Sequence, residues 1–300
     1  MKADKAYDVV YIGNYTKDTI ISPAGIRYVD GGAVNYAAHA AVRIGFTVAV
    51  VTHLASEDRR VVEKFAQAGI DCFPTYTSHS TLMNLEYPTD NPDVRNLSVP
   101  QTAGSITVGE VEGLQVKVAV IGTSLRGEVG LEVIQALSKK DMLMAADMQG
   151  FVRVLRSQDL VYEPWDEMQA TLAYLDILKS DAVEAEFLTG ERSIHKAAQI
   201  YAQMGPNEIV LTHKDGLLVL AEGQFHEAGF YPQRMDGRSG RGDTCLGTYA
   251  AVRQIMPPAE ACVWAAAVTS LKMENLGPFN RSIDEVEALI RDRYQPGLVR

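Results

Sequence analysis

The feature that most constrains this chain is the regular alternation of short apolar runs with amphipathic segments. The apolar runs are rich in β-branched residues and have the length of strands covered on both faces; they occupy residues 7–13, 46–54, 116–124, 141–148, 175–180 and 207–213. Segments with helical periodicity lie between them, at residues 34–45, 59–69, 128–139, 165–174, 182–189 and 194–204. This order predicts a three-layer αβα fold with a mostly parallel central sheet.

Two segments interrupt the alternation. Residues 18–32 have the character of a hairpin, and residues 73–100 alternate polar and apolar side chains between proline turns, as strands with one wet face do. We expect them to form a small β lid that projects from the main body; a decorated surface loop is the alternative. No repeat, low-complexity tract or linker divides the sequence, so we expect one domain over residues 1–300.

Charge and hydropathy exclude several classes of partner. The formal net charge of −10 would repel nucleic acid and anionic membranes over most of the surface. No window reaches the roughly 18 apolar residues of a membrane span, and the N-terminal stretch does not resemble a secretory signal. We therefore expect a cytoplasmic protein with no nucleic-acid or membrane partner.

A glycine-rich stretch before a small-residue helix, MDGRSGRGDTCLGTYAAVR at residues 235–253, is the strongest local signal. Gly240 and Gly242 give backbone freedom, and a helix beginning near Asp243 presents unpaired N–H groups and a positive dipole end. Such a helix start binds anions. Asp243 is then either an N-cap, which this stretch alone favours, or a base that accepts a proton from an attacking hydroxyl.

Two common nucleotide fingerprints are absent, because the sequence has no GxxxxGK[ST] loop and no GxGxxG after a first strand. It instead resembles the ribokinase-like (PfkB) carbohydrate kinases along its whole length. In that family a GAGD segment forms the anion hole and supplies the catalytic base; here it reads Gly240, Arg241, Gly242 and Asp243. The resemblance implies phosphoryl transfer from ATP with Mg²⁺ to a small-molecule hydroxyl, beneath a lid that excludes water.

The same resemblance implies the other site residues. A Gly-Gly pair, Gly31 and Gly32, opens the helix ending at Gly45, and the first strand leads to Asp18, where the family grips a substrate hydroxyl. The carboxylate motif that organises Mg²⁺ and phosphate is Asp181-Ala-Val-Glu184, and the nucleotide-flanking segment LTHKDG contributes Thr212 and Gly216. The segments GNYTKD, ADMQGFVRVL and NLGPF are similar to the myo-inositol kinase branch, which implies a cyclic polyol as substrate.

The sequence departs from the family pattern at several positions. Gly237 stands where an aspartate commonly opens the glycine-rich motif, and Asp236 lies one place earlier, which implies either a one-residue shift or a lost contact. Arg241 replaces a small residue, where it would either clamp a phosphate or crowd the nucleotide. Tyr36 falls where the substrate-binding asparagine is usual; Asn35 is adjacent, and we assign it to the substrate. His213 replaces a glycine.

The segment ADMQGFVR, residues 146–153, follows a predicted strand and falls at the sheet edge where ligands bind in α/β proteins. Its residues Gln149 and Arg153, together with Asp147, are candidates for binding polyol hydroxyls or a phosphate; a helix cap with a solvated arginine is the alternative. Other hypotheses are a nucleoside or other sugar kinase, which Tyr15, Phe73, Tyr76 and Tyr87 leave open, and a catalytically silent ligand-binding homologue. The unpaired edges of a lid would also suit a homodimer.

Overall fold

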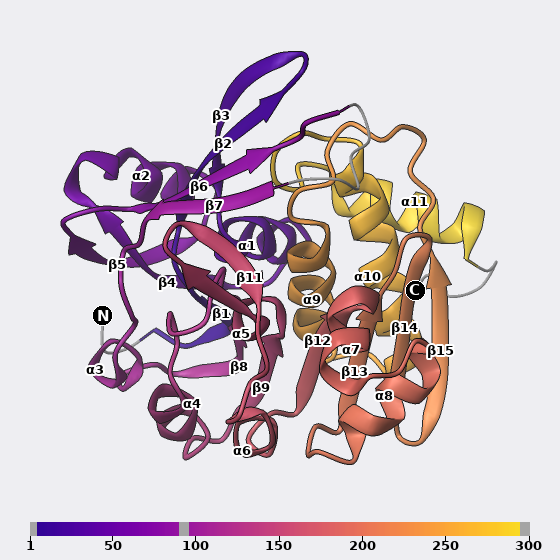
Figure 1. Cartoon of the computed structure of the whole chain (residues 1–300). Coiled ribbons are helices and arrows are strands. Elements are labelled where there is room, and N and C mark those ends of the chain that lie inside the picture. The colour runs from indigo at the N-terminus through magenta and orange to yellow at the C-terminus, as the bar shows by residue number, and fades with distance from the viewer. Residues whose placement is uncertain (1–4, 90–95, 295–300) are drawn as a thin grey trace.

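The computed structural model describes residues 5–89 and 96–294, and it contains two β-sheets of unequal size (Figure 1). The larger sheet has nine strands in the order β15-β14-β13-β12-β9-β8-β1-β4-β5. In that order they are Gln224–Gly229, Gly216–Ala221, Glu208–Thr212, Ile177–Asp181, Leu143–Asp147, Val116–Ile121, Tyr7–Ile12, Val48–Ala55 and Asp71–Thr77. The strands from β13 to β5 are parallel, whereas β14 and β15 pair antiparallel at one edge.

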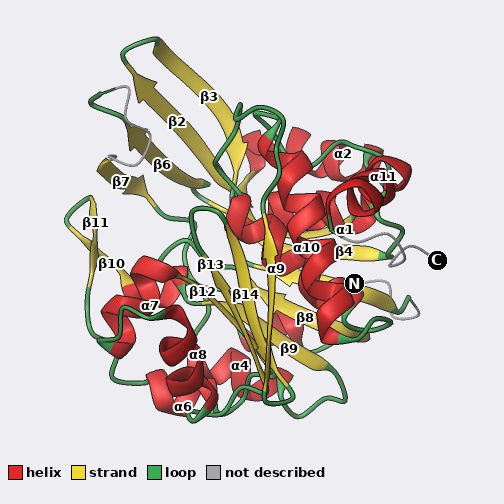
Figure 2. Cartoon of the chain, turned by 90° about the vertical axis from the view of Figure 1, so that its right-hand side faces the viewer, coloured by secondary structure: helices red, strands yellow, loops and turns green. Residues whose placement is uncertain are grey.

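Helices cover both faces of this sheet, as Figure 2 shows. One face packs on α1 (Ala33–Arg43), α2 (Arg60–Gln67), α9 (Arg241–Val252), α10 (Pro258–Met273) and α11 (Ile283–Arg293). The other packs on α3 (Val108–Val111), α4 (Leu131–Leu137), α6 (Met168–Leu172), α7 (Ala182–Thr189) and α8 (Ile194–Ala202). The short helix α5 (Gln149–Val152) follows β9, and a 3-10 turn (Ser56–Asp58) precedes α2. The expected three-layer αβα fold is confirmed.

The central strands are apolar on both faces because each face carries its own core. Alternate residues of one strand divide between the two cores: Val9 and Tyr11 of β1 pack under α1 and α9, while Val10 and Ile12 pack on the opposite side. This explains why these strands read as nearly continuous hydrophobic runs rather than alternating ones.

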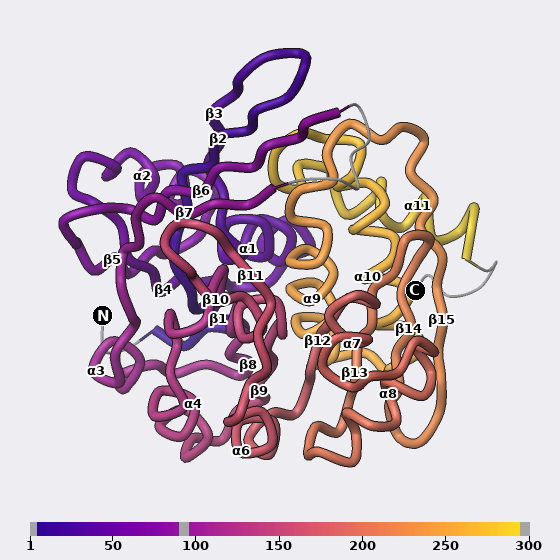
Figure 3. The backbone as a smooth tube through the Cα atoms, in the orientation of Figure 1, coloured from indigo at the N-terminus to yellow at the C-terminus, as the bar shows by residue number. Residues whose placement is uncertain are grey.

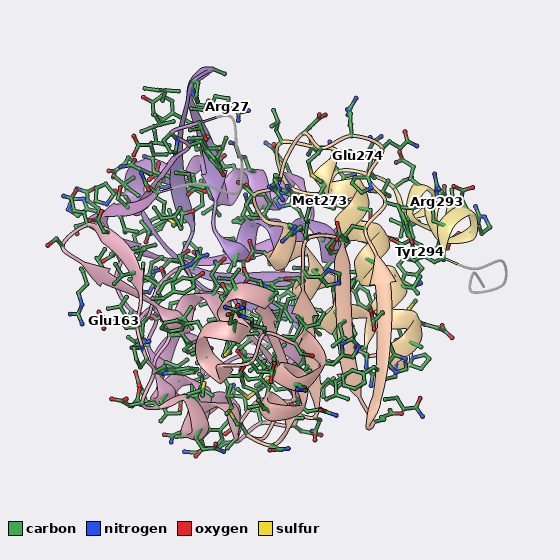
Figure 4. All side chains as sticks on the ribbon, turned by 45° about the vertical axis from the view of Figure 1, so that its right-hand side comes forward. Arg27, Glu163, Met273, Glu274, Arg293 and Tyr294 are labelled. Atoms are coloured by element: carbon green, nitrogen blue, oxygen red, sulfur yellow. The ribbon has the colours of Figure 1, made fainter. Side chains whose placement is uncertain are left out.

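The smaller sheet has six strands in the order β10-β11-β7-β6-β2-β3. Their bounds are Arg153–Arg156, Asp159–Tyr162, Asn96–Gln101, Thr81–Glu86, Thr16–Ser22 and Gly25–Gly31. The tube in Figure 3 shows the β2–β3 hairpin extending beyond the larger sheet and its helices, and Figure 4 labels Arg27 at this projecting end. An apolar cluster of Met83, Leu85, Val99 and Leu125 lies beneath the sheet.

The first of the two expected lid segments lies in the smaller sheet, whereas the second is divided between the two sheets. The segment 18–32 corresponds to β2 and β3, although β2 begins at Thr16. The segment 73–100 divides: its first residues, through Thr77, belong to β5 and pair with β4 in the larger sheet. The reason is that residues 71–77 continue the parallel register of β4. Residues 90–95 of this segment lie outside the described residues, and the β10–β11 strands of the smaller sheet were not expected.

Candidate active site

A cavity of about 250 Å³ lies between the carboxyl ends of the large-sheet strands and the smaller sheet. Asp181 and Thr212, the last residues of β12 and β13, line it from the large sheet. Asp18 of β2 and Leu97 of β7 line it from the smaller sheet, and the first turn of α9 closes one side. The position agrees with the general placement of ligands at the carboxyl ends of parallel strands.

The first turn of α9 is shaped by two glycines that permit close approach. Gly240 is the N-cap, with a left-handed φ of 75°, and a Cβ there would overlap the ring of Tyr36. At Gly242 a Cβ would lie 2.5 Å from Nζ of Lys179. The positive end of the helix dipole therefore lies at the cavity wall, with a buried ammonium group directly beside Gly242.

That ammonium group belongs to a buried ion pair. Nζ of Lys179, on β12, lies 2.8 Å from Oδ2 of Asp147, at the end of β9, and both side chains are almost fully buried. Burial alone would lower the pKa of Lys179, but the negative charges of Asp147, Glu184 and Asp181 outweigh it and raise the pKa. A permanent positive charge therefore lies at the floor of the cavity.

Asp243 lies in the same first turn and lines the cavity. Burial and the nearby negative charge of Asp147 raise its pKa to about 6, against the opposing effect of Lys179 and Arg153. A carboxylate with such a pKa is ionised at neutral pH and has a higher proton affinity than an exposed aspartate, which suits a general base.

Asp18 faces the cavity from β2 and accepts a hydrogen bond from Oγ1 of Thr16 at 2.6 Å. Gly31, on the neighbouring strand β3, pairs with Thr16, and a Cβ at Gly31 would overlap the Asp18 carboxylate. Gly32 follows with φ of 91° and starts α1, and a Cβ there would lie 2.7 Å from the carbonyl oxygen of Asn14. The Gly-Gly pair thus makes room for Asp18 and turns the chain into the helix.

The smaller sheet covers the cavity with apolar side chains. Met83, Leu85 and Tyr87 point into it from β6 and the residue after it, and Leu97 adds to them from β7. Leu82 and Asn84, the intervening residues of β6, line a separate hollow that Lys17 also lines. The cavity therefore has an apolar roof and a polar, charged floor.

Arg153 forms part of the polar wall. It is the first residue of β10, it is buried, and its Nε has no hydrogen-bond partner. A terminal nitrogen, Nη2, lies 4.0 Å from Oε1 of Glu184, which also has no hydrogen-bond partner. Gln149 lines the same wall from α5. The Arg153 guanidinium is thus a second positive charge in the cavity wall, and its Nε–H is a hydrogen-bond donor without a partner.

Asp181 and Glu184 cap the helix α7 reciprocally. The N–H of Glu184 donates to Oδ1 of Asp181 at 2.8 Å, and the N–H of Asp181 donates to Oε2 of Glu184 at 3.0 Å. Burial and the charge of Asp181 raise the pKa of Glu184 to about 7, although Lys179 and Arg153 lower it. Over residues 5–89 and 96–294, no group of three or more His, Cys, Asp or Glu residues could hold a metal by itself.

Most residues predicted from the sequence line this one cavity, namely Asp18, Gly32, Gln149, Arg153, Asp181, Thr212, Gly240, Arg241, Gly242 and Asp243. Gly31 lies beside Asp18, where its lack of a side chain leaves room for the carboxylate. Glu184 is fully buried beneath Asp181, and Gly216 lies in the antiparallel pair of β14 with β15. Asn35 donates its side-chain amide to the carbonyl of Asp30, whereas its neighbour Tyr36 lines the cavity.

Several lining residues were not predicted: Thr16, Met83, Leu85, Leu97, Ser124, Lys179, Arg238 and Ser239. The period-2 pattern of Met83, Leu85 and Tyr87 was a usable signal for one face of a strand. Lys179 offered a second signal, because a lysine inside an otherwise apolar strand is buried only when it has a partner. Thr16 and Ser124 carry no comparable sequence pattern.

The site and fold define a phosphotransferase that acts on small molecules, and comparison with known proteins identifies the family. Residues 4–284 match the model of the pfkB family carbohydrate kinases. The chain belongs to this family, whose members transfer a phosphoryl group to a hydroxyl acceptor.

Three relatives illustrate the range of the family. A solved pyrophosphate-dependent kinase of the ribokinase family, complexed with a pyrophosphate analogue and myo-inositol, is 30% identical, with a TM-score of 0.86 over 93% of this chain and 99% of that one. A cytidine kinase of Thermococcus kodakarensis is 25% identical over 85% of this chain and 92% of the relative. A ribokinase of Arabidopsis thaliana complexed with ribose and ATP shares the fold, at 15% identity and a TM-score of 0.77 over 96% and 99% of the two chains.

Among the described helices, none is long and apolar enough to cross a bilayer.

Proposed function

We propose that this kinase transfers a phosphoryl group to a hydroxyl of a cyclic polyol such as myo-inositol. The observation that carries the proposal is the two-sided character of the cavity. Its apolar roof suits the C–H face of a saturated ring, while Asp18, Arg153 and Gln149 offer charged and polar groups to ring hydroxyls. The structural relative that was solved with myo-inositol supports the same substrate class.

Asp243 is the proposed general base. The substrate hydroxyl loses its proton to the Asp243 carboxylate as its oxygen attacks the terminal phosphorus of the donor, and the bond from that phosphorus to the leaving phosphate oxygen breaks. The N–H groups of Gly240 and Gly242 at the start of α9 stabilise the charge on the transferred group, and the Lys179 ammonium beside Gly242 adds a full positive charge.

Asp181 and Glu184 fit a hydrated Mg²⁺ ion. Asp181 lines the cavity, and Oε1 of Glu184 is a buried acceptor without a partner. Mg²⁺ commonly uses one or two carboxylates together with waters and substrate phosphates, so a cage of three protein ligands is not required. When bound, the ion would supply charge neutralisation for the donor phosphates. The chain itself orients Asp181 through the α7 cap.

The donor is proposed to be ATP, as the resemblance to the family implies. Thr212 at the end of β13 and Arg241 at the start of α9 line the cavity where donor phosphates would enter. The guanidinium carbon of Arg241 lies 5.9 Å from the centroid of the Phe230 ring, so the side chain has an aromatic platform. The pyrophosphate-dependent relative makes inorganic pyrophosphate the second candidate donor, because two arginines, Arg238 and Arg241, line the cavity and bind phosphates without requiring a base.

The smaller sheet is proposed to act as a lid. Its strands contribute Thr16, Asp18 and the apolar roof to the same cavity as α9. Closure over a bound polyol would exclude water that could otherwise accept the phosphoryl group.

A nucleoside is the second candidate acceptor, favoured by the cytidine kinase relative. Of the four aromatic residues considered from the sequence, Tyr87 lines the cavity. Tyr15 is buried with its hydroxyl on Asp30, and Phe73 packs against Tyr7. Tyr76 lies at the surface. Of these four residues, Tyr87 is therefore the one placed to stack on a base, and Tyr36 adds a second ring to the cavity lining.

The test is a two-way panel of acceptors and donors. Phosphoryl transfer to myo-inositol, ribose, fructose and cytidine would be measured with Mg²⁺ and either ATP or pyrophosphate. We expect turnover on the polyol, which Asp243→Asn abolishes and Asp284→Asn, in the exposed first turn of α11, leaves unchanged. Preferred turnover of cytidine would replace the polyol assignment, and full activity of Asp243→Asn would remove the proposed base.

A further inference from the structure

The end of β4 holds three of the connections between the two sheets. The hydroxyl oxygen of Thr52 accepts a hydrogen bond at 2.7 Å from the N–H of Tyr15, in the connection that leads from β1 to β2. The N–H of Ala55 donates to Oγ of Ser80 at 2.9 Å, in the connection from β5 to β6. The third connection, from β7 to α3, contacts the side chain of His53. The smaller sheet is therefore fastened to the large one at the end of a single strand.

His53 is buried, and each nitrogen of its ring lies within hydrogen-bond distance of an oxygen. Nδ1 lies 3.1 Å from the carbonyl oxygen of Ala103, and Nε2 lies 2.8 Å from Oε1 of Glu110. Burial alone would raise the pKa of Glu110, but hydrogen bonds from Thr75 and Thr107 outweigh it and lower the pKa to about 2, so this group is a carboxylate. Carbonyl and carboxylate oxygens only accept hydrogen bonds. Both ring nitrogens must therefore donate, and the ring is an imidazolium cation.

The bond to Ala103 leads directly to the roof of the cavity. The N–H of Ala103 donates to Oγ1 of Thr81 at 3.0 Å, and Thr81 is the first residue of β6. Thr81 also pairs with Thr16 on β2, whose hydroxyl donates to Asp18. The following residues of β6 carry part of the apolar roof. His53 lies outside the cavity lining, yet it is linked to both the roof and the acceptor-binding carboxylate through one chain of hydrogen bonds.

The bond to Glu110 holds a different part of the molecule. Oε2 of Glu110 accepts from the N–H of Thr107 at 2.6 Å and so caps α3, and Oε1 accepts from the hydroxyl of Thr75 on β5. These contacts stay within the large sheet and a helix that covers it. The two ring nitrogens of His53 therefore have separate tasks, since Nδ1 holds the chain where it leaves the smaller sheet and Nε2 holds α3 to the large sheet.

We infer that His53 is a positioning residue whose Nδ1–H holds the chain at Ala103, and through it β6, at the angle that places the roof over the acceptor. This inference rests on the proposed function of the site. Without the bond, the roof would admit water. A water molecule would then attack the terminal phosphorus in place of the acceptor hydroxyl and give its proton to Asp243. The bond from phosphorus to the leaving phosphate oxygen breaks as before, and the donor is hydrolysed to inorganic phosphate.

Two substitutions separate the two hydrogen bonds of the ring. The amide nitrogen of asparagine is bonded to Cγ, as Nδ1 of histidine is, so His53→Asn retains a donor toward Ala103. The amide nitrogen of glutamine is bonded to Cδ, as Nε2 of histidine is to Cδ2, so His53→Gln retains a donor toward Glu110. His195→Gln is the matched control, because Nε2 of His195 lies 2.9 Å from Oε1 of Glu227 in an exposed histidine–carboxylate pair between α8 and β15.

The experiment measures consumed donor and phosphorylated acceptor together, with the acceptor and donor that give the highest wild-type turnover. The wild type, His195→Gln and His53→Asn should consume donor and phosphorylate acceptor in equal amounts. We expect His53→Gln to consume donor in excess of acceptor and to lose up to about 100-fold in kcat/KM for the acceptor, the effect of a misplacement of about 1 Å. Both variants at His53 leave one acceptor oxygen unpaired and should be less stable, so stability does not account for a difference between them.

Two results would overturn the inference: equal ratios of donor to acceptor in His53→Asn and His53→Gln, or an excess of donor consumption in His53→Asn alone, which would assign the role to Glu110. Amide hydrogen exchange without substrates separates this inference from the proposed function. If the wild type phosphorylates no acceptor, faster exchange of β6 and β7 in His53→Gln than in His53→Asn still supports the role of Nδ1, and equal exchange contradicts it. If a variant does not fold, nitrogen NMR of the wild type decides, because a His53 ring without a proton on Nδ1 would contradict the inference and a proton on both nitrogens would support it.

Discussion

Nζ of Lys179 lies 2.8 Å from Oδ2 of Asp147 and directly beside the position where Gly242 lacks a side chain. The pair crosses from β12 to β9, adjacent parallel strands of the large sheet, and carries a charge to the floor of the cavity without exposing it to solvent. Its removal should therefore affect stability and phosphoryl transfer together.

Lys179→Met should leave the buried Asp147 carboxylate without its partner. We expect a loss of about 3–5 kcal/mol in the free energy of unfolding, the usual result of breaking a buried pair on one side. The double variant Lys179→Met with Asp147→Asn should recover part of that loss, because no unpaired charge remains. Urea unfolding of both proteins and of Asp147→Asn completes the cycle; losses of the two single variants that add up to the loss of the double variant would mean that the pair is not coupled energetically.

Gly240→Ala should impair both folding and turnover. Its left-handed φ of 75° disfavours any side chain, and the added Cβ would overlap the Tyr36 ring. Gly223→Ala provides the matched control, because Gly223 has a φ of 74° and open space around its Cβ position. We expect Gly223→Ala to lose about 1 kcal/mol and keep its kcat, while Gly240→Ala loses more stability and at least about 10-fold in kcat. Equal behaviour of the two variants would contradict the role of the Tyr36 contact.

Asp243 should give the pH dependence of activity an acid limb near pH 6. The pKa of about 6 in the free enzyme means that the base is protonated below that pH, so kcat/KM should fall as the pH decreases through 6. The measurement is a kcat/KM profile for the acceptor from pH 4.5 to 8. A profile with no limb in this range would show that a different group accepts the proton.

The same group should cost stability at neutral pH. Because folding raises the pKa of Asp243 above its unfolded value near 3.9, the folded state binds the proton more tightly, and the cost grows as the pH rises from about 4 to 6. At pH 7, the free energy of unfolding of Asp243→Asn in a denaturant titration should therefore exceed that of the wild type by up to about 3 kcal/mol. At pH 4 the two proteins should differ little. A gain independent of pH would contradict this account.

Asp18→Asn should act on the acceptor rather than the donor. Loss of the carboxylate charge removes an acceptor for polyol hydroxyls but leaves an amide of equal size beside Thr16. We expect kcat/KM for the polyol to fall about 100-fold, with little change in the KM of the phosphoryl donor. Asp159→Asn, at an exposed position of β11 in the same small sheet, should behave as the wild type. A loss seen mainly in the donor KM would move Asp18 to the other half of the site.

Sequence patterns predicted those parts of the fold in which local signals agree with the tertiary environment. The parallel strands were visible as continuous apolar runs because both of their faces are buried, and the start of α9 was visible because only glycines fit against Tyr36 and Lys179. The β10–β11 hairpin was missed because its four-residue strands are too short to show a period, and the β14–β15 hairpin was missed although β14 is a continuous apolar run. Residues 73–77 were placed in the lid because Pro74 argues against a strand inside a sheet. These residues belong instead to β5, an edge strand, where proline is tolerated.

The site was predictable to the extent that its chemistry lies in short motifs. Asp18, Asp181 and Asp243 each stand in such a motif, and all three line one cavity. Lys179 was missed because it is a single charged residue inside an apolar strand, and its partner comes from a distant part of the chain. Only the three-dimensional arrangement brings Asp147 to it.

The smaller sheet is assembled from segments that are far apart in the chain: residues 16–31, 81–86 with 96–101, and 153–162. Between them the chain passes through β4, β8 and β9 of the large sheet. Closing such long loops is entropically unfavourable until the intervening strands are in place. We therefore expect the roof of the cavity to form late in folding and to open first, so that amide hydrogens of β6 and β7 exchange with solvent before those of β1 and β8.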